Sequence, residues 1–408
     1  MKHVRIALFV VFTFNGFVSC AGLRAKPYDQ STRNMLQEYR KGSFSQAYIM
    51  ADKLVKRSGG PKNRDYYLTL LERGKVALAN GNYDQAIKDL QTAEKRFLKI
   101  EDTLSIREEV STLFTHERGK EYEVEPHEML LISPYLALAY LSRGDFPGAI
   151  VERNRAINKI NHYVERAKKK YLENPFSRYV SALIYEMEGR GSEAAIEYRK
   201  IIKTFNYLKD MKKRSRRSND LVILVDVGLA PSRYEIKYGP EDITCDQQTY
   251  TVSFAYAGIR PTKSRINRCH VFVDGTEKGK TRLLYNLEKT VMIQYNKTRS
   301  KRIGYLVNRS LIRLGADIEA HKTGGVMDGP RNAIIRAIGK GIRLINKLTI
   351  KADLRQWATL PKNIQYIRIP DLSAGDHTIK ITYPGGAQVQ TVRVKKDTVN
   401  ILYKVVPY

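Results

Sequence analysis

The stretch "GNYDQAI", residues 81–87, carries a pattern that returns three more times along the chain. A glycine is followed five residues later by an alanine, and two residues later by an aromatic ring or, in the last copy, by Gly191. The other copies are "GSFSQA" from Gly42, "GDFPGA" from Gly144 and "GRGSEA" from Gly189. Glycine is favoured just past a helix end, and alanine lets two helices approach closely. The pattern therefore predicts four helical hairpins.

Around the best copy, "YYLTLLERGKVALANGNYDQAIKDLQTAEKRF", small residues at Gly74, Ala86 and Ala93 mark the expected helix contacts. This pattern resembles the tetratricopeptide repeat, a stacked pair of antiparallel helices. A generic array of helical hairpins is the alternative. The repeat glycines are 39, 63 and 45 residues apart. An insertion of about 25–30 residues, "EDTLSIREEVSTLFTHERGKEYEVEPHEM", is therefore expected between the second and third copies, as a partly helical excursion.

Longer stretches resemble a particular family. "EYEVEPHEMLLISPYLALAYLSRGDFPGAIVERNR", "ENPFSRYVSALIYE" and "KADLRQWATLPKNIQ" are similar to landmarks of exported proteobacterial lipoproteins of uncharacterised function, which combine a tetratricopeptide-like region with a β-rich tail. An intrahelical ion pair and an anchored turn are the structural alternatives to a functional role for these landmarks. The residues concerned are Glu152, Arg153 and Arg155 on one helix, and Asp353, Arg355 and Trp357 near the tail.

The N-terminus predicts export. A basic head, "MKHVR", precedes the apolar run "IALFVVFTF", which has the length of a signal-peptide core. The following Phe17-Val18-Ser19-Cys20 resembles the bacterial lipobox, which implies acylation of Cys20 after removal of residues 1–19 and a tether over residues 20–30. Cleavage at an ordinary signal-peptidase site is the alternative. The expected location is the periplasm, lipid-anchored at the outer membrane of a Gram-negative bacterium, where nucleic acid is not a partner.

Charge is distributed unevenly. The chain has 71 Lys and Arg against 42 Asp and Glu, a formal net charge of +29. Residues 207–408 hold 37 basic and 17 acidic side chains, net +20, whereas residues 21–206 are net +7. Such a field favours anionic partners. In the expected compartment these are acidic lipid headgroups or anionic envelope polymers.

The fold class expected is α+β with several domains. Residues 31–206 are predicted as an all-α, tetratricopeptide-like solenoid, 207–219 as a basic linker, and 220–408 as a basic, β-rich and sandwich-like domain with an inserted amphipathic helix. Apolar or alternating runs predict strands at "LVILVDVG", "YTVSFAY" and "HVFVDG". The runs "HTIKITY", "AQVQTVRV" and "VNILYKVV" predict an antiparallel meander of three strands.

The inserted helix is expected in "DGPRNAIIRAIGKGIRLINKL". Its spacing gathers four cations on one face, opposite a stripe of isoleucine and leucine. Such a helix either lies on an anionic membrane surface or packs its apolar stripe on the sheet. The cations are Arg336, Lys340, Arg343 and Lys347.

Two cysteines, Cys245 and Cys269, remain in the mature chain. In an oxidising periplasm they either form a disulfide or stay as two unpaired thiols.

No motif for catalysis, cofactor or metal is found in the sequence. "GTEKGKT", residues 275–281, has three residues between its glycines where a phosphate loop needs four, so it is interpreted as a hairpin turn. Zinc-protease spacing, a nucleophile elbow and paired-cysteine knuckles are missing. We therefore expect a protein that is not an enzyme and holds no cofactor or metal.

A partner-binding groove follows from the resemblance to the repeat family. The first helices of the repeats would line a concave face that takes an extended peptide or a helix from an envelope protein. The rival hypothesis is that the basic C-terminal domain binds an anionic envelope polymer or lipid headgroups. The groove residues implied are Lys75, Leu78, Leu138, Tyr179, Leu183 and Glu186.

Overall fold

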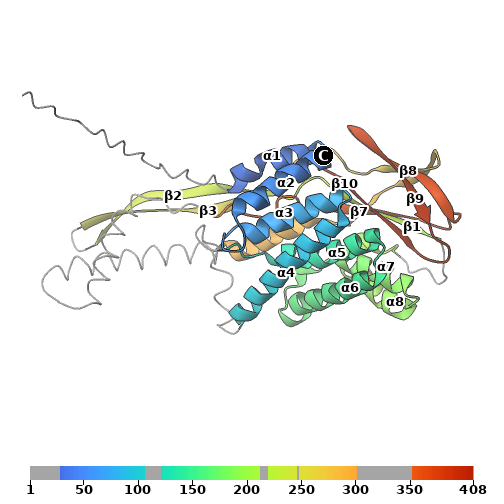
Figure 1. Cartoon of the computed structure of the whole chain (residues 1–408). Helices are drawn as coiled ribbons and strands as arrows, with labels where there is room; N and C mark the ends of the chain where they lie inside the picture. The colour runs from blue at the N-terminus through green and yellow to red at the C-terminus, as the bar shows by residue number, and fades with distance from the viewer. Residues whose placement is uncertain (1–27, 106–120, 212–218, 246–247, 301–351, 408) are drawn as a thin grey trace, which may run out of the picture.

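The computed structural model describes residues 28–105, 121–211, 219–245, 248–300 and 352–407 (Figure 1). Cys20 and the four cations expected on the amphipathic helix, Arg336, Lys340, Arg343 and Lys347, lie outside the described residues. Most of the basic linker and part of the insertion, residues 106–120, also lie outside them.

Stacked helix pairs form the N-terminal part of the protein, residues 28–208, and this confirms the helical hairpins expected from the glycine pattern. Short helical turns, His162–Arg166, Lys170–Leu172 and Asn206–Leu208, follow the later pairs. The pairs are α1 (Tyr28–Arg40) with α2 (Phe44–Ser58), α3 (Tyr66–Ala79) with α4 (Tyr83–Ser105), α5 (Pro126–Arg143) with α6 (Phe146–Asn161), and α7 (Pro175–Met187) with α8 (Gly191–Thr204).

The repeat glycines adopt the backbone conformation that their positions just past a helix end predict. Gly42, Gly81, Gly144 and Gly189 all have φ between 76° and 86°, the left-handed region that glycine enters at little cost. Each one reverses the chain between the two helices of a pair. Gly74 serves packing instead, because a Cβ there would lie 2.9 Å from Cγ of Leu90 on the paired helix.

Two four-stranded sheets follow the helices. The inner sheet has the order β10 (Asn400–Val406), β1 (Leu221–Val227), β7 (Asn363–Ile369), β6 (Arg282–Tyr285). The outer sheet has the order β5 (Thr276–Lys280), β4 (His270–Val273), β8 (Gly375–Tyr383), β9 (Gly386–Val394). Asp274 and Gly275 both have positive φ at the turn between β4 and β5, so the stretch 275–281 begins in a hairpin turn, as expected, and continues as strand β5.

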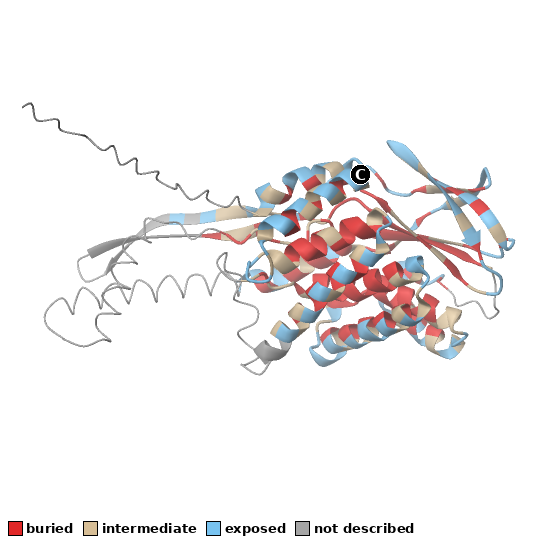
Figure 2. Cartoon of the chain, in the orientation of Figure 1, coloured by how far each residue is buried: buried red, intermediate tan, exposed pale blue. Residues whose placement is uncertain are grey.

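Strand β1 lies between the helices and the outer sheet. Every residue of β1 is buried, which explains its near-continuous apolar run. Val222 and Leu224 belong to the core formed with the helices, while Leu221, Ile223 and Val225 belong to a core shared with the outer sheet. The helices, the inner sheet and the outer sheet therefore form successive layers (Figure 2).

The prediction of a three-stranded antiparallel meander at the C-terminus is only partly correct. β8 and β9 form the predicted antiparallel hairpin, but β10 leaves it and pairs parallel with β1 in the inner sheet. The reason is burial. Leu402 and Val406 face the core between the sheets, and Val405 packs against α1 and α2, so β10 is covered on both faces. The alternating pattern identified the strand but not its neighbour.

A two-stranded ribbon, β2 (Ser232–Cys245) and β3 (Gln248–Arg260), extends away from the body (Figure 1). Among the described strands, β2 and β3 pair only with each other. Residues 287–300 form a helix that the sequence reading did not predict.

Helices and inner sheet share one apolar core. Leu78 and Leu138 of the helices lie in the same cluster as Leu224, Trp357 and Ile364 of the second half. The boundary expected near residue 206 is therefore crossed by the protein's main core.

Candidate functional site

Five of the six residues expected to line an open groove are buried beneath the protein's own second half, and Glu186 is partly buried there. Lys75 and Leu183 are fully buried, and Leu78, Leu138 and Tyr179 nearly so. The ring of Tyr179 packs edge-on against Tyr366 of β7, and Glu186 pairs with Arg368 of the same strand. We call this set of six the inner face. It faces β1, β7, β10 and residues 352–360, so it is not an open groove in this structure.

Lys75 of α3 is the centre of the first polar cluster on the inner face. Its Nζ lies 2.7 Å from Oδ2 of Asp226 on β1, and neither side chain is more than 1% exposed. The Tyr135 and Tyr403 hydroxyls donate to the same carboxylate oxygen at 2.8 and 2.7 Å. Burial lowers the pKa of Lys75, and the Asp226 carboxylate opposes that shift. The pair joins the helices to the inner sheet.

The carboxylate of Glu72, one helical turn before Lys75, accepts hydrogen bonds from the main chain of the second half. The backbone N–H groups of Ala358 and Thr359 donate to its two oxygens at 2.7 and 3.0 Å. The Tyr28 hydroxyl donates to it at 3.2 Å. Burial raises the pKa of Glu72 to about 7, although these donors lower it. Through these backbone hydrogen bonds, Glu72 binds the 352–360 segment in the way that a groove binds an extended peptide.

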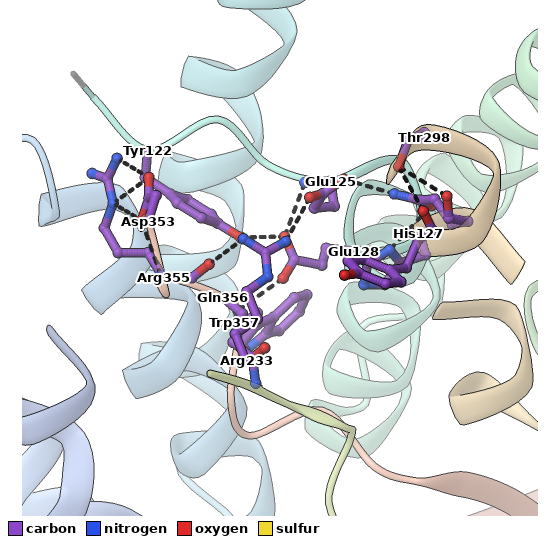
Figure 3. A network of polar contacts seen from close by, with 12 residues as sticks. Tyr122, Glu125, His127, Glu128, Arg233, Thr298, Asp353, Arg355, Gln356 and Trp357 are labelled. Atoms are coloured by element: carbon purple, nitrogen blue, oxygen red, sulfur yellow. Dashed lines mark hydrogen bonds and ion pairs between the residues drawn. The ribbon is translucent and has the colours of Figure 1, made fainter. Parts of the chain in front are cut away.

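The start of α5 holds the same segment through a second carboxylate (Figure 3). Glu128 accepts the backbone N–H of Trp357 at 2.8 Å, and its other oxygen accepts the Tyr122 hydroxyl and the Glu125 backbone N–H. Glu125 and Glu128 also form the capping box that begins α5 behind Pro126. One pair of residues therefore starts the helix and fixes the segment.

Glu125 continues this network into the ribbon and the helix of residues 287–300 (Figure 3). Arg233, at the base of β2, donates to Glu125 at 2.5 Å and to the Arg355 carbonyl at 2.7 Å. Gln294 donates to the other oxygen of Glu125 at 2.6 Å and lies 3.1 Å from Nδ1 of His127. The base of the ribbon is thus joined to the helices by buried, paired groups.

The landmark residues of the tail form an anchored turn. The Arg355 guanidinium pairs with Asp353 at 2.6 Å and with Asp65, at the start of α3, at 2.9 Å. The indole of Trp357 is 1% exposed and packs edge-on against the Tyr135 ring, with centroids 6.1 Å apart. These contacts support the structural alternative for this set.

The landmark residues of α6 lie in a second charged cluster, within the helices, in which Glu152 and Arg153 are buried and Arg155 is exposed. Arg155 pairs with Glu152 one turn earlier at 2.6 Å, while Lys159 pairs with Glu94 of α4. Arg153 pairs with Glu188 at the end of α7. Burial, and secondarily the Glu94 carboxylate, raise the pKa of Glu152 to about 7. The cluster links three helices, and its acids already face cations.

Asp274, His377 and Ser373 are arranged in a way that resembles a catalytic triad. Nδ1 of His377 on β8 lies 2.6 Å from Asp274, and its Nε2 lies 3.2 Å from the hydroxyl of Ser373. Nε2 also lies 2.8 Å from the Ser373 carbonyl, which can only accept a hydrogen bond. Nε2 must therefore carry a proton and cannot take one from the hydroxyl. Asp274, followed by this carbonyl, raises the pKa of His377, as expected of a structural imidazolium.

Cys269 is a free, buried thiol. Burial raises its pKa to about 11. The side chain of Cys245 lies outside the described residues.

No described helix is both long and apolar enough to cross a bilayer. Nor do the described ranges contain a cluster of three or more His, Cys, Asp or Glu side chains that could hold a metal ion.

Comparisons of the chain with protein-family models, with curated proteins and with solved structures found no match. The buried contacts that hold the second half on the inner face therefore define the candidate site on geometry alone.

Sequence reasoning missed the partners of the inner face. Glu72, Glu128 and Asp226 were not singled out, although each carries a visible signal. Asp226 is the one charge in "LVILVDV", and Glu128 completes the capping box in "EVEPHEM". A charge inside a run that must be buried needs a buried partner. The apolar run around Asp226 shows that a buried partner is needed, but it does not identify that partner.

The raised pKa of Glu72 predicts a pH-dependent stability. A carboxyl with a folded-state pKa near 7 and an ordinary value of 4.5 binds its proton more tightly in the folded state. Stability should therefore fall as pH rises from about 5 to 8. Glu72 should account for a fall in the free energy of unfolding on the order of 3 kcal/mol. Urea unfolding at several pH values measures this fall.

Glu72→Gln should remove a large part of the slope, and Glu165→Gln, at an exposed carboxyl, should leave it unchanged. Equal slopes for Glu72→Gln and the unsubstituted chain would contradict the assignment to Glu72.

Proposed function

We propose that the chain is a non-enzymatic, membrane-anchored scaffold of the bacterial envelope that binds a protein partner through its β2–β3 ribbon. The proposal keeps the tetratricopeptide-like identity of the helix pairs and the lipid anchor at Cys20. It moves the partner site from the inner face to the ribbon, because the inner face is covered by the protein's own strands.

The observation that carries the proposal is a body with one shared core from which a two-stranded ribbon extends (Figure 1). A strand edge presents backbone N–H and C=O groups, and an extended segment of another protein can pair with them. An isolated hairpin is only marginally stable, so its base must be held. Arg233 on Glu125, and the Ala352 N–H on Glu235 at 3.1 Å, supply that hold.

The register of the ribbon allows a clean deletion. Tyr238 lies opposite Phe254, so replacing residues 239–253 by Asn-Gly joins these two strand positions through a two-residue turn. The shortened chain keeps the paired base and all contacts of the body. Crosslinking in cells, followed by purification and mass spectrometry, should recover a defined protein with the full chain. Recovery should fall to background with the shortened chain.

The control is the melting temperature, which should be the same for both chains. Equal recovery of the same protein by the shortened chain refutes a ribbon site. A chain that ends near Phe205 is not a suitable control, because removing the second half would uncover the apolar inner face.

A further inference from the structure

The outer helices of the four pairs present equivalent residues to solvent. Counted from the glycine that precedes each outer helix, positions 7, 11 and 14 lie on one face, because steps of four and three residues return to the same side of a helix. Eleven of these twelve residues are exposed, and the side chain of Lys200 is 34% exposed. This outer stripe consists of Ile49, Lys53 and Lys56 on α2, Lys88, Thr92 and Lys95 on α4, Val151, Arg155 and Asn158 on α6, and Ile196, Lys200 and Lys203 on α8.

The composition of the outer stripe is one-sided. Seven of its residues are cations, three are apolar, two are neutral polar and none is acidic. Position 7 is apolar in three of the four helices, and these side chains, Ile49, Val151 and Ile196, are 46, 48 and 42% exposed. Large apolar side chains recurring at one exposed repeat position are not explained by the core.

Some stripe cations have acidic neighbours on the flanks of their helices. Lys56 pairs with Asp52 at 2.8 Å while its own side chain stays 77% exposed. Arg155 pairs with Glu152, and Lys200 lies 3.5 Å from Glu165. The acids Asp52 and Glu152 are more buried than the cations they meet. The outermost charge is therefore positive at Lys56 and Arg155, whereas Glu165 is more exposed than Lys200.

We propose that the outer stripe docks on the surface of an anionic lipid bilayer. Cations that surround separate apolar side chains suit the interface of such a bilayer, where ammonium groups meet lipid phosphates and apolar side chains enter the headgroup layer. The stripe runs over four helices, and its three apolar residues lie on three different helices. A flat, extended anionic surface fits this pattern better than the compact apolar pocket of a protein partner.

The length of chain before α1 agrees with this occupant. Only seven residues, 21–27, lie between Cys20 and Tyr28, where α1 begins, and the eight residue-to-residue steps span at most about 28 Å when fully extended. An acyl anchor at Cys20 therefore keeps the first helix pair close to the bilayer. The anchoring belongs to the proposed function, but docking of the stripe is tested without it.

The experiment uses the chain from residue 21 onward, which lacks the lipid and retains every described residue. Binding is measured by flotation with vesicles of phosphatidylcholine alone, and of phosphatidylcholine with phosphatidylglycerol at about three to one. The expected result is binding to the anionic vesicles only. Lys53→Glu, Lys95→Glu and Lys203→Glu together should weaken that binding by about tenfold or more. Ile49→Ser, Val151→Ser and Ile196→Ser together should also weaken it.

The lysine control changes the same number of exposed residues elsewhere, and the apolar control changes one exposed residue. Lys278→Glu, Lys380→Glu and Lys396→Glu alter the net charge equally, and Val389→Ser removes an apolar side chain that is 63% exposed on β9. Both control variants should bind anionic vesicles at least fivefold more tightly than the stripe variants, with unchanged melting temperatures for all four.

Either of two results overturns the proposal. One is failure of the unsubstituted chain to bind anionic vesicles, which would leave an acidic protein as the occupant to test. The other is an equal loss of binding in the control and stripe variants, because then net charge and not the stripe carries the affinity. The chain with the shortened ribbon should bind vesicles normally, so failure of the ribbon site and failure of the stripe are distinguishable.

Discussion

Substitution of Asp226 by asparagine is expected to lower the free energy of unfolding by about 3–5 kcal/mol. Asparagine keeps the shape of the side chain and can still accept the hydroxyls of Tyr135 and Tyr403. What it removes is the charge that faces Lys75, whose side chain is 0% exposed. The ammonium then stays buried without a carboxylate or gives up its proton, and both outcomes cost free energy.

Urea unfolding followed by fluorescence suits this measurement, because the single tryptophan, Trp357, lies in the core shared by the helices and the inner sheet. Adding Lys75→Met to Asp226→Asn should restore most of the loss, since neither position of the pair then carries a buried charge. Lys53→Met, at an exposed lysine of α2, should change stability by less than about 0.5 kcal/mol. A loss below about 1 kcal/mol for Asp226→Asn would mean that the pair does not hold the two halves together.

Replacing Trp357 by alanine should cost about 3–5 kcal/mol, the usual range for removing a large buried aromatic side chain. The indole is 1% exposed and packs against the Tyr135 ring, while its backbone N–H is held by Glu128. Because the same core contains residues of the helices and of the inner sheet, unfolding should remain a single transition at lower urea concentration.

Far-UV circular dichroism is the appropriate probe here, since the substitution removes the fluorophore. Val389→Ala, at an exposed position of β9, serves as the control and should leave the midpoint almost unchanged. Two transitions, with only the β-rich one moved by Trp357→Ala, would show that the halves fold independently.

The features that the sequence predicted correctly are local ones. Gly81 and its three equivalents end helices because of backbone conformation, which depends on the residue itself. The strands β1, β8 and β9 follow from runs of alternating or continuous apolar residues, which report burial on one face or two. Neither argument requires knowledge of a distant neighbour.

The features that were missed are contacts between distant segments. Lys75 on the inner face is compatible with an open groove that binds an acidic peptide, and equally with a buried pair. Only the position of Asp226 on β1 decides between them. The parallel partner of β10 was missed for the same reason, because an apolar strand shows that it is covered but not by what. The candidate site is built almost entirely from such contacts.

The pairing of β1 with β10 also bears on how the protein is made. Val222 lies beside Ile401, so the strand that follows the helices cannot pair with β10 until residues 228–399 have been synthesised. Until then Leu78, Leu138 and Leu183 have no strands over them, and the helices present an apolar surface. Topologies dominated by such distant pairings fold slowly. Until β10 has been synthesised and paired, the protein therefore needs protection from aggregation.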